Sequence, residues 1–175
     1  MKDIDIVNWA LLKLAQRPIA ENEQRYEKYK SIIPALHQSM LRSFIWGFAK
    51  RVTSISPLYL KRCDITRFAL PKKCLRVLEV NLSGEIRGGG FEAQGEIEQN
   101  LNIKYLKSVP LEDCDPLYKE AFAFKLASEL CPLLVGDNQL RAYLADCHKN
   151  LMADAVDKEA IEIVDVRENQ ESYYG

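Results

Sequence analysis

The chain has 175 residues, 47% of them hydrophobic, so it is long enough to bury a core without disulfides or metal ions. Its net charge of -1 excludes a uniformly basic surface that would bind nucleic acid over the whole molecule. The charge is uneven along the chain. Residues 41–87 contain ten basic and three acidic residues, whereas residues 88–175 contain eight basic and seventeen acidic ones. This asymmetry predicts that one end or face of the molecule differs electrically from the other.

The five cysteines match no zinc or redox motif in their spacing, so we interpret them as reduced packing residues. No run of 18 apolar residues occurs, and no apolar signal-peptide core follows Met1. We therefore expect a protein that folds in a cytosol and does not enter a membrane.

Two helices are predicted at the beginning of the chain. In residues 3–16, apolar residues recur at helical spacing from Ile4 to Leu14, and Pro18 follows the end. In residues 22–43, an apolar stripe runs from Tyr29 to Met40. Because Pro34 lies inside this second segment, we expect either a kink or a later helix start.

β-Branched and aromatic residues then alternate with prolines and glycines, which predicts strands. We expect a sheet of about four short strands near residues 64–69, 75–82, 85–93 and 102–109.

The pattern becomes helical again at Asp115-Pro116, where aspartate is a good N-cap and proline loses no internal hydrogen bond at the first helical position. The helix that follows is apolar around much of its circumference and should be the most buried. Gly136 and Asp137 separate it from a last helix. Its expected buried stripe comprises Leu140, Leu144, Cys147 and Leu151, widened by Tyr143.

Together these elements predict an α+β fold, in which a four-helix bundle carries a small antiparallel β domain inserted between helices 2 and 3. The expected divisions are residues 1–45 and 111–157 for the two halves of the bundle, 46–110 for the β-rich insertion, and 158–175 for an extended acidic C-terminal arm. An arm that does not pack on its own chain often becomes ordered on a partner.

No catalytic, cofactor-binding or metal-binding group is predicted. The Gly88–Gly90 triplet is followed by neither Lys-Ser/Thr nor a helix, so it is better interpreted as a hairpin tip than as a nucleotide site. Cys147 and His148 are adjacent in a predicted helix and point about 100° apart, which disfavours a catalytic pair. We expect Cys147 in the core and His148 solvated or at a helix end.

The acids Glu112, Asp113 and Asp115 precede a helix, where its dipole and capping explain them better than hydrolysis does. The acidic residues of the arm lack the spacing of a calcium loop.

A group of basic residues in and near the insertion carries the strongest functional signal. Its members are Lys50, Arg51, Lys61, Arg62, Arg67, Lys72, Lys73, Arg76 and Arg87. They either form a solvated sheet face that pairs with acids of a neighbouring subunit, or they face a polyanion such as DNA. The nearby Trp46, Phe48, Tyr59 and Phe68 are explained by core packing at least as well as by base stacking.

The order and spacing of several segments resemble phage head-to-tail adaptors, including the tail tubular protein A or gatekeeper subunits of short-tailed phages. These segments are WGFA at 46–49, FALPKKCLRVLEV at 68–80, GGGFEAQGEIE at 88–98, NIKYLKSV at 102–109 and DPLYKEAFAFKLASEL at 115–130. With the flanking helices, the resemblance spans nearly the whole chain.

The resemblance implies a structural virion protein at the head-tail junction, made in the host cytoplasm and assembled into a homo-oligomeric ring, typically of twelve subunits. Such a ring binds the portal protein, and double-stranded DNA passes through its channel without sequence recognition. The β domain would face the next tail protein, a nozzle or stopper, and the C-terminal segment would dock on the portal. The docking candidates are Ile161, Ile163, Val164, Val166, Tyr173 and Tyr174. Only some of the basic residues are expected to face DNA, and the rest to lie on subunit interfaces.

Two alternatives remain open at the level of sequence. The first is a nucleic-acid-binding regulator that uses the basic insertion, which predicts tight, salt-sensitive DNA binding by the isolated protein. The second is an adaptor that also cleaves cell wall, for which Glu112 and Glu120 would be the carboxylates to test.

Overall fold

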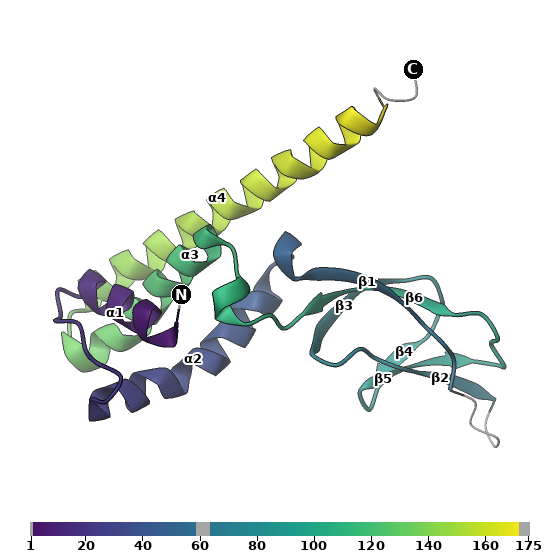
Figure 1. Cartoon of the computed structure of the whole chain (residues 1–175), viewed down its shortest axis with the longest axis horizontal. Helices are drawn as coiled ribbons and strands as arrows, with labels where there is room; N and C mark the ends of the chain where they lie inside the picture. The colour runs from purple at the N-terminus through teal and green to yellow at the C-terminus, as the bar shows by residue number, and fades with distance from the viewer. Residues whose placement is uncertain (1, 59–63, 172–175) are drawn as a thin grey trace. The chain divides into compact units, whose positions relative to one another are not determined.

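The computed structural model of the chain describes residues 2–58 and 64–171, with side chains as far as Ala155. It contains two compact units. The helical unit comprises Met1–Met40 and Val109–Gly175, and the β unit comprises Leu41–Ser108. The helices are α1 (Asp3–Lys13), α2 (Gln24–Ser43), α3 (Pro116–Leu134) and α4 (Asn138–Glu171). The strands are β1 (Lys50–Ile55), β2 (Ile65–Ala69), β3 (Cys74–Val80), β4 (Glu85–Arg87), β5 (Gly90–Gln94) and β6 (Leu101–Lys107) (Figure 1). The predicted α+β fold, with a sheet region between the second and third helices, is confirmed.

α1 ends three residues earlier than the sequence predicted, because the chain turns sharply after Leu14. Ala15 adopts a left-handed conformation with φ 53°. The amides of Ala15 and Gln16 donate to the carbonyls of Leu12 and Leu11, at 3.1 and 2.9 Å. This is the Schellman arrangement that closes many helices, here with alanine in the position where glycine is usual.

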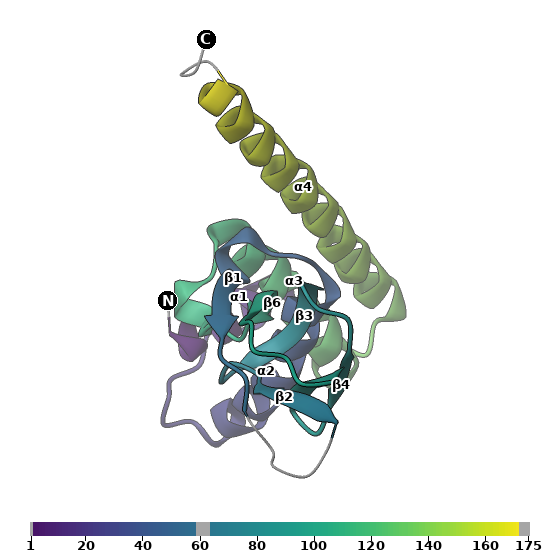
Figure 2. The same ribbon diagram turned by 90° about the vertical axis from the view of Figure 1, so that its right-hand side faces the viewer.

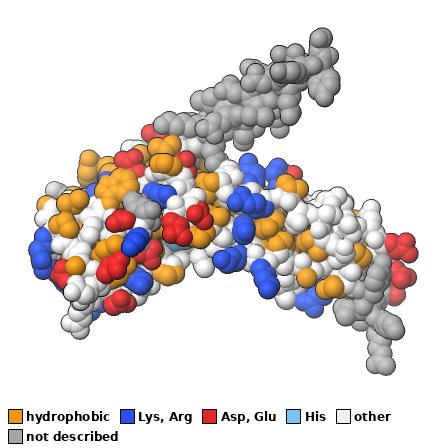
Figure 3. Space-filling model, in the orientation of Figure 1, with side chains coloured by type: hydrophobic (Ala, Val, Ile, Leu, Met, Phe, Trp, Pro, Cys, Tyr) orange, Lys and Arg blue, Asp and Glu red, His pale blue; other side chains and the backbone are white. Residues whose placement is uncertain are grey.

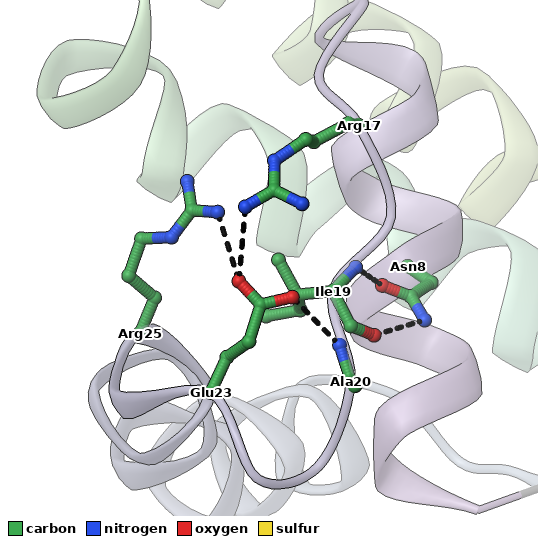
Figure 4. Close-up of polar contacts among 6 residues, drawn as sticks. All are labelled: Asn8, Arg17, Ile19, Ala20, Glu23 and Arg25. Carbon is green, nitrogen blue, oxygen red and sulfur yellow. Dashed lines mark hydrogen bonds and ion pairs between the residues drawn. The ribbon is translucent and has the colours of Figure 1, made fainter.

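The connection between α1 and α2 is fixed by side chains (Figure 4). The Asn8 amide nitrogen donates to the Ile19 carbonyl at 3.0 Å, and the Ile19 amide donates to the Asn8 oxygen at 2.8 Å. The Glu23 carboxylate pairs with Arg17 at 3.2 Å and with Arg25 at 3.0 Å. One amide thus satisfies both backbone groups of Ile19, whose side chain is buried.

α2 runs through Pro34 without being divided. Pro34 lies on the exposed face, so water can hydrate the carbonyl that loses its intrahelical donor. The opposite face buries Tyr29, Ile33 and Met40, as predicted, whereas Leu36 is half-buried and His37 takes the buried position beside it.

α3 begins where the sequence predicted. The Asp115 side chain accepts a hydrogen bond from the Leu117 amide at 2.7 Å, and Pro116 occupies the first turn. Buried residues surround the helix from Tyr118 to Cys131. The helix ends at Leu134 and is followed by Gly136, whose φ of 72° favours glycine. Asp137 then caps α4 by accepting hydrogen bonds from the amides of Gln139 and Leu140.

α4 packs along α3 as the second arm of a helical hairpin (Figures 1 and 2). Leu144 is buried and Cys147 is half-buried, but Tyr143 is 64% exposed, so the prediction that Tyr143 widens the buried stripe is wrong. α4 continues to Glu171, and most of the segment that we expected to be extended is helical. No proline or glycine occurs between Asp137 and Tyr174 to end the helix.

The β unit consists of two three-stranded antiparallel sheets. Sheet A has the strand order β1-β6-β3, and sheet B has the order β2-β5-β4. They form two layers in Figures 1 and 2. The sequence predicted β2, β3 and β6 closely. It merged β4 and β5 into one strand, and it missed β1, in which Val52 lies on the exposed face and weakens the alternation that marks a strand.

The core of the β unit lies between the two sheets. Phe68, Phe91 and Ala93 of sheet B pack with Leu101 of sheet A, and all four are at most 2% exposed. The rings of Phe68 and Phe91 are 6.2 Å apart. Ile55 and Val80 contribute from β1 and β3. This core defines an inner face of sheet A, which faces sheet B, and an outer face, which does not.

Candidate polyanion-binding surface

Basic side chains gather at one end of sheet A, where β1 begins, β3 begins and β6 ends. We call this group the basic end. It comprises Lys50, Arg51, Lys72, Lys73, Arg76 and Lys107. In Figure 3, blue side chains gather over the start of β1. The strand register brings these residues together although they are up to 57 positions apart in sequence.

Lys50 and Arg76 form one cross-strand row on the outer face of sheet A. Both are register partners of Leu106, from the two sides of β6. Since neighbouring strands are about 4.8 Å apart, the Cα atoms of the two cations lie about 10 Å from each other. The adjacent row on this face contains Lys104, which is paired with Glu79 at 3.0 Å. Neither Lys50 nor Arg76 has an ion-pair partner among the residues that the structure describes.

Lys72 and Lys73 lie in the turn that leads into β3. The Lys73 carbonyl accepts a hydrogen bond from the Ser108 amide at 2.8 Å, and Lys107 is the register partner of Cys74. Arg51 lies at the same end, and its guanidinium donates to the carbonyls of Phe48 and Lys50 at 2.9 and 2.7 Å. Hydrogen bonds to neutral carbonyls leave its positive charge uncompensated.

Two predicted candidates belong elsewhere. Arg67 lies on sheet B, 3.7 Å from Glu92 and 3.1 Å from the Gly88 carbonyl, and Arg87 pairs with Glu85 at 2.6 Å. Both serve contacts within sheet B. Lys61 and Arg62 lie outside the described residues, as does Tyr59. Sequence reasoning missed Lys107, because only the observed register of β3 and β6 brings it beside Cys74.

Three of the six acidic residues of the β unit lie at the opposite end. Asp64, Glu96 and Glu98 are exposed and precede β2 or β6, and we call these three residues the acidic end. Red side chains mark this end of the unit in Figure 3. Over the whole sequence range 41–108, twelve basic residues stand against six acidic ones, so the unit has a positive net charge, with six of its cations at the basic end and three of its acids at the acidic end.

The aromatic residues near the basic group are packing residues where the structure describes them. Trp46 is 1% exposed, with the ring centres of Phe44 and Phe48 at 5.2 and 5.6 Å. Phe68 belongs to the inter-sheet core. Base stacking needs an accessible ring face, which neither Trp46 nor Phe68 offers.

The glycine triplet forms a hairpin turn between β4 and β5. Arg87 and Gly90 are register partners, which leaves Gly88 and Gly89 as a two-residue loop with φ values of 52° and 74°. Positive φ at both positions is the signature of a type I′ turn. No helix begins here, so this turn lacks the helix N-terminus of a phosphate-binding loop.

The two histidines contact backbone carbonyls in the helical unit. The His37 Nε2–H donates to the Val109 carbonyl at 2.8 Å, and Nδ1 lies 2.8 Å from the Tyr118 hydroxyl. The His148 Nδ1–H donates to the Ala121 carbonyl at 3.0 Å, so our expectation of a solvated or helix-end His148 is wrong. It lies on the side of α4 that faces α3. Burial lowers the pKa of both histidines, and the accepting carbonyls oppose this shift.

The carboxylates that the sequence analysis considered for hydrolysis lie in or just before α3. Asp115 caps α3, and the exposed Glu112 lies in a short 3-10 turn before that helix. Glu120 lies on α3, where its charge favours the ammonium form of Lys13. Burial nevertheless lowers the pKa of Lys13, whose nitrogen is 3.5 Å from the centre of the Phe124 ring.

Within the described part of the chain, no three His, Cys, Asp or Glu residues are grouped as a metal site requires. Cys74, Cys114, Cys131 and Cys147 are free thiols, and burial raises the pKa of Cys114 to about 12. In residues 2–58 and 64–171, no helix has both the length and the apolar character needed to cross a bilayer.

No model of a known protein family matches the sequence, and a search of curated proteins finds no match to it.

Proposed function

We propose that the chain is a structural subunit of a ring-shaped phage head-to-tail adaptor, which docks on the portal, connects it to the tail and forms part of the DNA channel. The observation that carries this proposal is the architecture: a helical bundle interrupted between α2 and α3 by an antiparallel β unit with separated charges. This is the arrangement that the resemblance of segments 46–130 to such adaptors implies. The ring is expected to contain twelve copies at the head-tail junction of the virion.

In this role the protein acts mechanically and electrostatically, without a catalytic step. Lys50 and Arg76 project from the outer face of sheet A and are suited to contact phosphates, which carry charge but no sequence information. Lys104, already neutralised by Glu79 on the same face, keeps the surface mixed in character. A mixed surface lets DNA pass, because each phosphate contact is weak and easily exchanged.

The portal-docking segment is the C-terminal part of the chain. Tyr173 and Tyr174 lie outside the described residues, and the side chains of Ile161, Ile163, Val164 and Val166 lie beyond the last described side chain. Their docking role stays a prediction.

Electron microscopy of the purified protein, alone and mixed with portal assemblies, tests the proposal. We expect rings, seated on the portal when both are present. A chain ending at residue 159 should keep the bundle folded, as judged by circular dichroism, but should not remain on the portal. Absence of rings in every preparation would contradict the adaptor function, and portal binding by the shortened chain would contradict the docking assignment alone.

The basic end also supports the alternative function of a nucleic-acid-binding regulator, and DNA affinity separates the two. For an adaptor, we expect non-specific duplex binding with a Kd of about 10⁻⁴ to 10⁻⁶ M at physiological salt, whereas a regulator would reach about 10⁻⁸ M or tighter with sequence preference. The double variant K50E/R76E should lower the slope of log K against log salt by about two.

The control for this measurement is K28E/R141E, which makes the same change in net charge at two exposed positions of the helical unit. Its DNA binding should match that of the unmodified chain. Equal losses in the two double variants would show that net charge, and not the outer face of sheet A, determines binding.

A further inference from the structure

The turn before β3 presents two lysines in a fixed conformation. Lys72 and Lys73 are exposed, and Lys73 has a φ of 65°. The turn is closed by a hydrogen bond from the Cys74 amide to the Pro71 carbonyl at 3.1 Å and is tied to the end of β6 by the Ser108 amide, 2.8 Å from the Lys73 carbonyl. Because the backbone is already ordered, a partner that binds these lysines does not have to order the turn.

A hollow of about 520 Å³ lies in the β unit at the side of its acidic end. Ile65 and Ile97 provide apolar walls, and Glu85, Glu92 and Arg87 provide charged groups. The acidic end is adjacent in sequence to this lining, because Asp64 precedes Ile65 and Glu96 and Glu98 flank Ile97; we call these three carboxylates the rim. The hollow therefore combines apolar surface and charged side chains with three acidic residues that are adjacent in sequence to its lining.

Charges inside the hollow are already compensated, but those on the rim are not. Glu85 pairs with Arg87, and Glu92 pairs with Arg67. Within the described residues, Asp64, Glu96 and Glu98 have no ion-pair partner, and the same is true of Lys72 and Lys73. The β unit thus has an unpaired cationic turn and an unpaired anionic rim.

These two surfaces cannot pair within one chain. β6 begins three residues after Glu98 and ends beside the turn, where Lys107 is the register partner of Cys74. Seven residues of strand are about 23 Å long, so the length of sheet A separates the lysines from the rim. Among the described residues, Lys72 and Lys73 can therefore reach the hollow only from a second molecule.

The geometry points to a contact between copies of this chain, in which the Pro71–Lys73 turn of one copy enters the acid-rimmed hollow of the next. Lys72 and Lys73 pair with the rim carboxylates, and the ring of Pro71 meets the apolar wall. Such a contact uses different surfaces on its two sides, so it repeats from copy to copy and closes into a ring when the rotation between copies permits. The inference rests on the proposed ring and names the surfaces that build it.

Charge exchange tests this contact by sedimentation velocity of the full chain. K72E/K73E and E96K/E98K should each weaken self-association by about tenfold or more, because each puts like charges on both sides of the contact. An equimolar mixture of the two variants should assemble again, since each then meets the opposite charge on the other. The quadruple variant K72E/K73E/E96K/E98K should assemble alone.

K28E/R141E is the matched control for K72E/K73E and should assemble like the unmodified chain, and circular dichroism verifies that every variant is folded. Assembly by both charge variants alone would overturn the contact and leave the ring itself intact. Loss that the mixture does not repair would also overturn it, and would assign Lys72 and Lys73 to another partner such as DNA. An unmodified chain that stays monomeric at all concentrations would overturn both the contact and the proposed ring.

Discussion

Replacement of Phe91 by alanine should destabilise the β unit by about 3–5 kcal/mol, which is most of the free energy of unfolding that a domain of this size has. Phe91 is 2% exposed and lies between the two sheets with Phe68 and Leu101. The cavity left by the ring cannot be filled by the small Ala93 beside it. Hydrogen exchange measured by mass spectrometry should show rapid exchange in residues 50–107 and continued protection in α1, α3 and α4.

Ile86 provides the control for this substitution. It is the register partner of Phe91 on β4, but 56% of it is exposed, so Ile86→Ala removes apolar contacts at the surface and should cost less than about 1 kcal/mol. If Phe91→Ala opens the helices as readily as the strands, the two compact units unfold as one, and the expectation of separate unfolding is wrong.

Replacement of His37 by leucine should cost the helical unit about 1–3 kcal/mol at pH 7.5, because the Val109 carbonyl loses its side-chain donor in a buried position. His37 is 9% exposed and is surrounded by the rings of Tyr118 and Phe122 at 5.6 and 5.9 Å. Denaturant titration monitored by helix content measures the loss. His37→Gln, whose amide can donate to the same carbonyl, should lose less.

The same residue makes stability depend on pH. The pKa of His37 and that of His148 are lowered by folding, so the unfolded chain binds more protons than the folded chain once the pH falls below about 6.5. Stability from these groups is fully present above that pH and is lost as the pH falls toward the lowered pKa values. His37→Leu should therefore flatten the dependence between pH 7 and 5, and an unchanged slope would contradict the role of His37.

Local rules predicted the helices well because their signals are local. Asp115-Pro116 caps α3 through a hydrogen bond within three residues, and Gly136 provides the left-handed residue after it. The end of α1 escaped prediction for the opposite reason. Ala15 takes a conformation for which alanine has little preference, and the buried Ile19 and the Asn8 amide hold the following segment in place.

The strands were harder to predict because their environment depends on partners distant in sequence. β3 contains two register irregularities, between Cys74 and Arg76 and between Val77 and Glu79, so its residues do not keep a strict alternation. In β1, Val52 lies on the outer face of sheet A. Neither feature can be recognised without knowing that both strands flank β6.

The sequence predicted the basic surface as a group of residues between positions 50 and 87. In the structure, the pairing of β1, β6 and β3 determines which basic residues lie together. Charge counting grouped Arg67 and Arg87 with Lys50, although Glu92 and Glu85 compensate them on the other sheet. It omitted Lys107, which lies in the block of residues 88–175, where acidic residues outnumber basic ones. Knowing which strands pair identifies the residues of the basic end, and counting charges over a longer stretch of sequence does not.

The chain enters and leaves the β unit through neighbouring strands. β1, the first strand of the unit, is antiparallel to β6, the last, and Lys50 is the register partner of Leu106. The two strands therefore place the ends of the insertion about 5 Å apart. Because the pairing of β1 with β6 fixes both ends of the insertion, the segment between Lys50 and Leu106 acts as a closed loop on the helical unit. The length of this segment can therefore change at little cost in loop-closure entropy. Insertions, deletions or an exchanged β module between these two residues are thus compatible with an unchanged set of four helices, which makes this position the natural one for grafting.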